Sequence, residues 1–233
     1  MKKIKLLKDI LNLPKVEITF KNCDENSVDT FRKTYKYFTK PHRYKVFRNK
    51  TIGVGLIDLN EYDSFQEYHK VVNKKNYGAY YARRAQRKGY RFIEIDRNDY
   101  IDDIYEINTS AEFRQGKKMS EGYLTKVEYY EKEPGYKYYG IVNEEGKLVA
   151  YCNIPFFGEF TLLSVLLGHD KYLKDRIMYF MIYELVKVMF EVYKEQGYKY
   201  IMYDTFFGAS EGLQQFKRKI GFKPYKVKWR LEC

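Results

Sequence analysis

Residues 203–210 place a tyrosine, a carboxylate and a hydroxyl between an apolar strand and a helix. Asp204 is the only carboxylate from Tyr200 to Phe207, and Ser210 opens the helix. Ligands of α/β sheets bind where strands end and helices begin. We therefore predict a site in which Asp204 is a general base, with burial raising its pKa toward neutrality. The alternative is that Asp204 and Ser210 only satisfy the turn and cap the helix.

His169 is a second candidate base, because the ordinary pKa of histidine, about 6.5, is close to neutrality. It comes shortly after the apolar stretch at residues 161–167, at the end of a predicted strand. A lone loop histidine is more often structural, and that alternative stays open.

Three basic residues gather at the start of a long predicted helix: Lys171, Lys174 and Arg176. A helix N-terminus carries partial positive charge and unpaired N–H groups, so it favours anions. We predict that these side chains bind phosphate groups. The alternative is a solvated helix start.

Hydrophobic periodicity predicts the elements that must position these residues. We expect strands at residues 91–96, 138–142, 147–155, 161–167, 198–204 and 226–231, and helices at residues 98–107, 173–196 and 210–220. Residues 143–146 form a hairpin turn, and Gly197 ends the long helix. Because a helix connects residues 161–167 to residues 198–204, these two strands should pair in parallel.

The pattern changes near Gly89, where we place a boundary between an N-terminal extension or partial subdomain (residues 1–89) and a domain at residues 90–233. In the extension, residues 44–59 predict a strand or hairpin, interrupted by Gly53 and Gly55. A capped helix follows from residue 63. A basic helix at residues 80–88 ends at Gly89.

The composition is that of a folded chain with a basic surface. Its 233 residues are 45% hydrophobic and 18% aromatic, enough to bury a full core. A formal charge of +12 favours polyanions such as tRNA or DNA, although a solvated Lys-rich surface is an equal explanation. Without an apolar run of about 18 residues, we expect a cytoplasmic protein with no integral membrane segment.

The three cysteines, Cys23, Cys152 and Cys233, are far apart and form no CxxC pair. An odd number with this spacing argues against a disulfide framework and against a zinc site. We expect reduced thiols and no metal.

The order of elements from residue 90 to residue 231, together with the helix and Gly-Phe turn at residues 212–224, resembles the GNAT acyltransferase superfamily. The resemblance implies an α/β (α+β) fold with a mixed, mostly antiparallel sheet and a central splayed parallel pair flanked by helices. It also implies transfer of an acetyl-like acyl group from acyl-CoA to an amine acceptor, which is a small molecule or a macromolecule.

The same resemblance suggests roles for individual residues. GNAT enzymes hold the donor pyrophosphate on a Gly-rich loop, but Arg176 replaces a glycine here, so Lys171, Lys174 and Arg176 would contact the phosphates through side chains, with Ser210 nearby. Phe216 occupies the place of a tyrosine acid, so that role moves to Tyr203 or Tyr179. Acceptor-binding residues would be Arg114, Gln115 and Tyr123.

The basic helix at residues 83–89 and the loop at residues 114–116 resemble pieces of the FemABX-type aminoacyltransferases, which share the GNAT core. This second resemblance implies aminoacyl-tRNA as an alternative donor. From a different class, a basic GNAT-like protein would bind or modify nucleic acid. The first hypothesis remains an N-acyltransferase.

Overall fold

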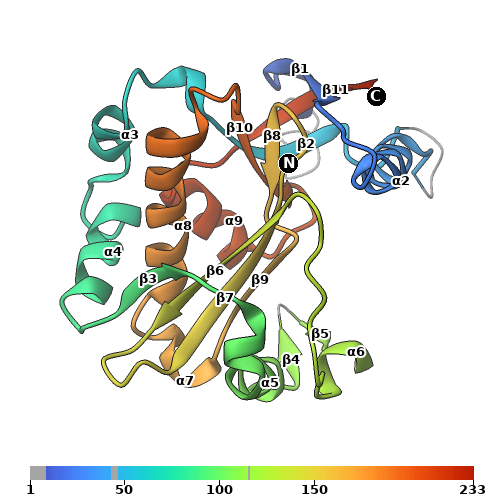
Figure 1. Cartoon of the computed structure of the whole chain (residues 1–233). Coiled ribbons are helices and arrows are strands. Elements are labelled where there is room, and N and C mark those ends of the chain that lie inside the picture. The colour runs from blue at the N-terminus through green and yellow to red at the C-terminus, as the bar shows by residue number, and fades with distance from the viewer. Residues whose placement is uncertain (1–8, 43–46, 115) are drawn as a thin grey trace.

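The computed structural model describes residues 9–42, 47–114 and 116–233 (Figure 1). Its strands are β1 (Lys15–Lys21), β2 (Ile52–Asp58), β3 (Arg91–Glu94), β4 (Phe113–Arg114), β5 (Lys117–Lys118), β6 (Tyr136–Val142), β7 (Leu148–Pro155), β8 (Phe160–Leu162), β9 (Val165–Gly168), β10 (Tyr200–Thr205) and β11 (Lys223–Glu232). Its α-helices are α2 (Val28–Thr39), α3 (Phe65–Val72), α4 (Gly78–Gln86), α5 (Ile101–Thr109), α6 (Glu121–Leu124), α7 (Asp170–Leu173), α8 (Ile177–Val188) and α9 (Glu211–Lys219).

Two sheets meet at β8 and β9, which together occupy the expected strand at residues 161–167. β8 pairs in parallel with β10, as predicted, in the order β1-β11-β2-β10-β8. After Leu163 the chain changes partner, and β9 pairs with β7 in the order β3-β6-β7-β9. The strand is interrupted because its two halves bond to different neighbours. β9 and β10 therefore diverge, which confirms the splayed parallel pair.

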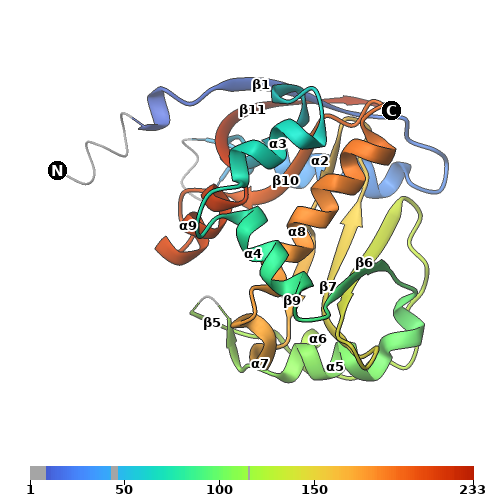
Figure 2. The same cartoon turned by 90° about the vertical axis from the view of Figure 1, so that its left-hand side faces the viewer.

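The sheet that ends in β9 is covered by helices on both faces. α8 packs on one face with α4 beside it, and α5 packs on the other (Figures 1 and 2). Because α8 contacts a sheet on one side and α4 on the other, almost its whole length is apolar, from Ile177 to Val186. It continues as a π-helical turn at Met189–Tyr193. Within the described ranges, no helix combines the length and apolarity needed to cross a membrane.

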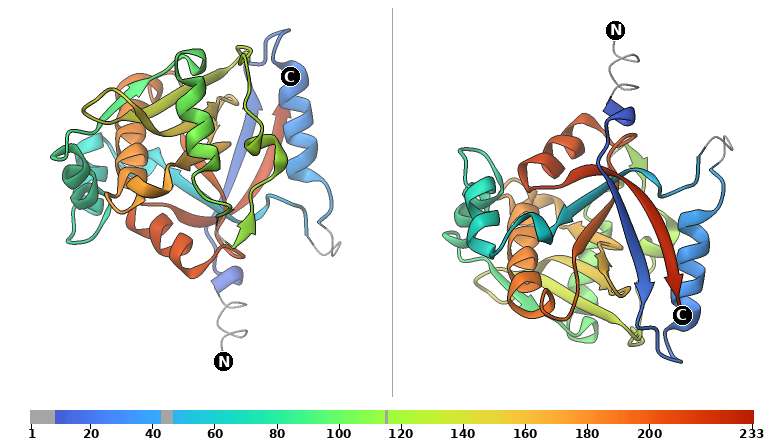
Figure 3. Two further views of the ribbon diagram at one scale, coloured as in Figure 1. Left: turned by 90° about the horizontal axis from the view of Figure 1, so that it is seen from below. Right: turned by 90° about the horizontal axis from the view of Figure 1, so that it is seen from above.

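The residues before Gly89 contribute two strands to the other sheet. β2 lies between β10 and β11, antiparallel to both, and β1 runs parallel to β11 along the edge (Figure 3). β1 alternates, with Ile18 and Phe20 buried against α2. Neither β1 nor α2 was expected from the sequence. The boundary at Gly89 remains a prediction, but hydrogen bonds of the five-stranded sheet cross it.

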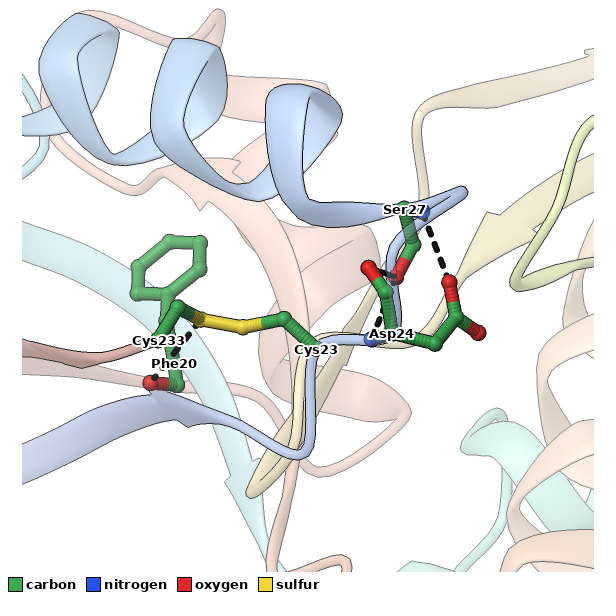
Figure 4. The surroundings of a disulfide bond; sticks show 5 residues. All are labelled: Phe20, Cys23, Asp24, Ser27 and Cys233. Carbon is green, nitrogen blue, oxygen red and sulfur yellow. Dashed lines mark hydrogen bonds between the residues drawn. A yellow bond between two sulfur atoms is a disulfide. The ribbon is translucent and has the colours of Figure 1, made fainter.

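Two of the three cysteines are joined, so the expectation of reduced thiols is wrong for them. Cys23, after β1, forms a disulfide with Cys233, after β11, across 210 residues of sequence (Figure 4). The parallel pairing of β1 with β11 brings the two residues together, with their Cα atoms 5.7 Å apart. Cys152 is a free thiol buried in the core.

Candidate active site

The divergence of β9 and β10 opens a cleft between their carboxyl ends. One cavity, about 450 Å³, lies between the two strands and the start of α9. A second, about 320 Å³, lies toward α7 and the start of α8. The two cavities share the lining residues Arg114, Leu166, Leu167, Tyr203 and Leu213, so we treat them as one cleft.

A bulge in β10 shapes the floor of this cleft. Met202 is opposite Leu56 of β2 and Thr205 is opposite Val54, so two residues of β10 face one residue of β2. Asp204 takes the left-handed conformation there, with φ 43°. Gly55 of β2 makes room, because a Cβ atom at this position would lie 2.9 Å from the Tyr203 carbonyl oxygen.

Lys217 of α9 lies beneath the bulge and is only 1% exposed. Its Nζ donates hydrogen bonds to the carbonyl oxygens of Tyr203 (2.7 Å) and Thr205 (2.8 Å), and it lies 4.5 Å from the centre of the Tyr203 ring. Burial lowers the pKa of Lys217 to about 8. The negative charge of Asp204 opposes this shift, and the positive charge of Lys50 adds to it. An amine with this pKa holds or releases a proton near neutral pH.

Lys217 was not among the residues selected from the sequence, although α9 carries a signal for it. The inward side of this helix includes Phe216 and Ile220, and Lys217 lies among them. A charged residue on the buried side of an amphipathic helix is costly unless it is bonded, and so marks a function or a buried network.

Asp204 does not have the environment that we predicted for a base. Its side chain is 60% exposed and forms an ion pair with Lys50. It also accepts a hydrogen bond from the backbone N–H of Thr205 (2.7 Å). Burial pushes the pKa of Asp204 upward, but the charge and hydrogen bond of Lys50 outweigh it and the pKa is lowered. The predicted rise of the pKa of Asp204 is wrong, because Lys50, 154 positions away in the chain, forms an ion pair that could not be read from the sequence.

His169 and Ser210 both cap helices. The Nδ1 atom of His169 accepts a hydrogen bond from the N–H of Lys171 (3.2 Å), and burial lowers the pKa of its imidazole. The Ser210 hydroxyl accepts from the N–H of Leu213 (3.3 Å) at the start of α9, as the capping alternative predicted. Ser210 lines the larger cavity, whereas the described lining of the cleft does not include His169.

The predicted acceptor residues differ in their placement. Arg114 lines both cavities, and its guanidinium donates to the carbonyls of Gly168 (2.9 Å) and Ile107 (2.6 Å), so it ties α5 to the end of β9. Burial lowers the pKa of Arg114. Tyr123 lines the larger cavity. Gln115 lies outside the described residues.

Tyr203 is the better placed of the two tyrosines that were considered for the acid. It lines both cavities and its ring lies 6.5 Å from that of Phe216. Tyr179 is packed against Phe216 (4.6 Å) in the core, where burial raises its pKa to about 12. The described lining of the cleft does not include Tyr179.

The loop before α8 does not fit the pyrophosphate of CoA in the manner of a Gly-rich loop. Its backbone N–H groups at residues 170, 171, 172, 175 and 176 donate hydrogen bonds within the protein. Arg176 has a left-handed backbone (φ 67°) and its guanidinium stacks 5.0 Å from the Tyr81 ring of α4. The exposed side chains of Lys171, Lys174 and Arg176 are available for anion contacts here.

A basic surface extends from this loop onto α4. The exposed residues of α4 and its C-terminal end include Arg83, Arg84, Arg87 and Lys88. Lys88 joins the two elements through its ion pair with Asp175 (2.5 Å). We call these residues, with Lys171, Lys174 and Arg176, the α4–α8 basic surface.

No protein-family model matches the chain, and no curated protein matches its sequence. Among solved structures, FemX matches with a TM-score of 0.58 at 8% identity, over 86% of this chain and 66% of FemX. The chain therefore shares the fold of FemX. A tandem GNAT protein from the clavulanic acid biosynthesis pathway matches with a TM-score of 0.46 at 15% identity, over 75% of this chain and 50% of its own.

A further match is L-PGS from Bacillus licheniformis, with a TM-score of 0.45 at 15% identity, over 76% of this chain and 58% of its own. The chain therefore spans between half and two thirds of the length of these structures. In this fold, β8–β9 and β10 are the splayed pair, and α8 is the long helix that connects them. The cleft and Lys217 are thus at the centre of the fold.

Proposed function

We propose that this protein is an acyltransferase that transfers an acyl group from an activated ester or thioester to an amine. The reaction would take place in the cleft between β9 and β10. The observation that carries the proposal is Lys217, a buried ammonium fixed by two carbonyls at the point where the strands diverge. A purely structural role for a charge at this depth is costly.

The chemistry requires a group that stabilises negative charge and a path for one proton. The amine nitrogen attacks the donor carbonyl carbon, a C–N bond forms, and the carbonyl oxygen becomes an oxyanion. Collapse breaks the bond to the leaving group, which takes up a proton as the amine loses one. Lys217 has two described hydrogen-bond partners and three hydrogens, so its third hydrogen serves the oxyanion or the leaving group.

We infer that the donor is an aminoacyl ester of tRNA, with acyl-CoA as the second candidate. Two observations support tRNA. The backbone N–H groups at residues 170, 171, 172, 175 and 176 are occupied by internal hydrogen bonds, and the α4–α8 basic surface includes the start of α8, where Leu173 and Met178 line the cleft. Lysine and arginine side chains neutralise RNA phosphates without any backbone cradle. Acyl-CoA would rely mainly on the side chains of Lys171, Lys174 and Arg176.

A binding and transfer panel tests the proposal. Thermal unfolding is recorded with acetyl-CoA, a long-chain acyl-CoA, tRNA and duplex DNA, and a ligand at about 100 times its Kd should add roughly 2.7 kcal/mol. We expect tRNA to stabilise the protein, less so as salt is raised. Radiolabelled aminoacyl-tRNA is then incubated with a set of amines, and amide products are sought by mass spectrometry.

The outcomes separate the donors and the alternative class. Stabilisation by acyl-CoA but not by tRNA would show that the donor is acyl-CoA, and the proposed acyltransferase activity would stand. Stabilisation by both tRNA and DNA, with no amide formed by any donor, would favour a nucleic-acid-binding protein. Loss of transfer in Lys217→Gln without loss of donor binding would show that the chemistry takes place at Lys217, where β9 and β10 diverge.

A further inference from the structure

Lys50 lies in the segment between α2 and β2, within the N-terminal extension, and contacts Asp204, which lines the cleft. Its backbone is held on both sides: the N–H donates to the carbonyl of Phe38 (3.0 Å), and the carbonyl accepts from the indole N–H of Trp229 (2.5 Å). The side chain is 17% exposed and its ammonium pairs with Asp204. The backbone of Lys50 is therefore fixed, and its mostly buried side chain lies beside Asp204.

The pair acts on the β10 bulge. Asp204 accepts hydrogen bonds from Lys50 and from the N–H of Thr205, which together hold its left-handed conformation. The carbonyls before and after Asp204, those of Tyr203 and Thr205, are the two that receive the Lys217 ammonium. The shape of the bulge therefore decides where Lys217 is held.

We propose that Lys50 is a positioning residue for Lys217: by binding Asp204 it fixes the bulge whose two carbonyls hold the Lys217 ammonium, and it keeps Asp204 from pairing with Lys217. The catalytic meaning of this inference rests on the proposed function. The structural part of the inference, that Lys50 of the N-terminal extension controls the position and protonation of Lys217 in α9, does not depend on that function.

The charged groups around Lys217 determine the sign of the effect. Asp204 attracts the ammonium and Lys50 repels it. Across the cleft, Arg114 and Lys117 add positive charge to the lining, and the Tyr203 ring covers the amine. Removing Lys50 takes away a repulsive charge and releases Asp204 toward Lys217, so the ammonium form of Lys217 becomes more stable.

The test follows the titration of Lys217 by NMR of protein carrying ¹³C and ¹⁵N in its lysine side chains, with assignment from Lys217→Gln. In the parent protein the pKa of Lys217 is expected at about 8. We expect Lys50→Met to raise it by about half a unit or more and Asp204→Asn to lower it, because these variants remove opposite charges. Lys50→Arg, which retains the charge, should titrate like the parent.

Lys137→Met is the matched control, because it breaks an ion pair with Glu94 in the other sheet. Its Lys217 titration should not move. An unchanged titration in Lys50→Met would overturn the inference and leave Lys50 as a surface ion pair. Should Lys50→Met fail to fold, Asp204→Asn and Lys50→Arg decide, and a titration of Lys217 that does not move in Asp204→Asn would also overturn it. A shifted titration in a protein that transfers no acyl group would reject only the proposed function.

Discussion

Two basic regions, one inside the cleft and one at the start of α8 beside it, hold their charges in different ways. At the fork of β9 and β10, Lys217 is 1% exposed and is fixed by two backbone carbonyls. At the start of α8, Lys171, Lys174 and Arg176 are exposed. A single desolvated charge with a fixed position acts strongly on nearby atoms, whereas exposed charges act weakly one by one and attract polyanions as a group. We therefore propose that the chemistry takes place where β9 and β10 diverge and that the donor binds at the helix start.

The largest expected effect is at the fork. Lys217→Gln keeps a hydrogen-bond donor for the bulge carbonyls but removes the positive charge. We expect the transfer rate to fall by about 100-fold or more, in line with the loss of one oxyanion donor, while donor affinity is retained. Single-turnover kinetics and donor titration measure the two quantities. Equal losses of rate and affinity would contradict the division between the two regions.

The second effect is at the helix start. Lys174→Ala combined with Arg176→Ala should weaken donor binding by about tenfold at low salt and leave the fold intact, because two phosphate-binding charges are lost. The matched control is Lys33→Ala with Lys36→Ala, which removes the same charge from the exposed side of α2. Filter binding measures both. If the two double variants bind the donor equally well, the helix start is only a solvated surface.

Replacing Asp204 should reduce the transfer rate less than replacing Lys217. Because the pKa of Asp204 is lowered, its carboxylate is a weak base, and Asp204→Asn should reduce transfer by less than about tenfold, far from the loss of a positioned base. Melting temperature and transfer rate are recorded together. A loss of about 100-fold with an unchanged melting temperature would restore Asp204 as the general base.

The smallest effect is in the pH dependence of stability. Burial lowers the pKa of Lys217 from its ordinary value near 10.5 to about 8, so between these values the unfolded chain binds a proton that the folded chain does not. The free energy of unfolding of the parent should therefore rise with pH across this window relative to Lys217→Gln. Urea unfolding midpoints from pH 7.5 to pH 10.5 measure the difference, and a flat difference would show that Lys217 is not desolvated.

Local sequence signals predicted much of the frame around the cleft. Apart from the short elements β4, β5, α6 and α7, the strands and helices from β3 to β11 were expected from their periodicity, and so was the parallel pair at its centre. Ser210 was recognised as a possible cap, and the basic helix α4 was seen as a run of arginines. Such features depend on residues a few positions apart, which is the range over which periodicity and capping act.

The sequence by itself determined the order of the main strands and helices after Gly89 and the positive charge of the chain. Only the tertiary structure decided that β2 enters the sheet between β10 and β11, that Cys23 meets Cys233, and that Lys50 reaches Asp204. Each of these contacts joins residues more than 140 positions apart. Strand partners at that distance are selected by hydrogen bonding and burial in the folded chain, and the state of Lys217 depends on the charges that this selection brings beside it.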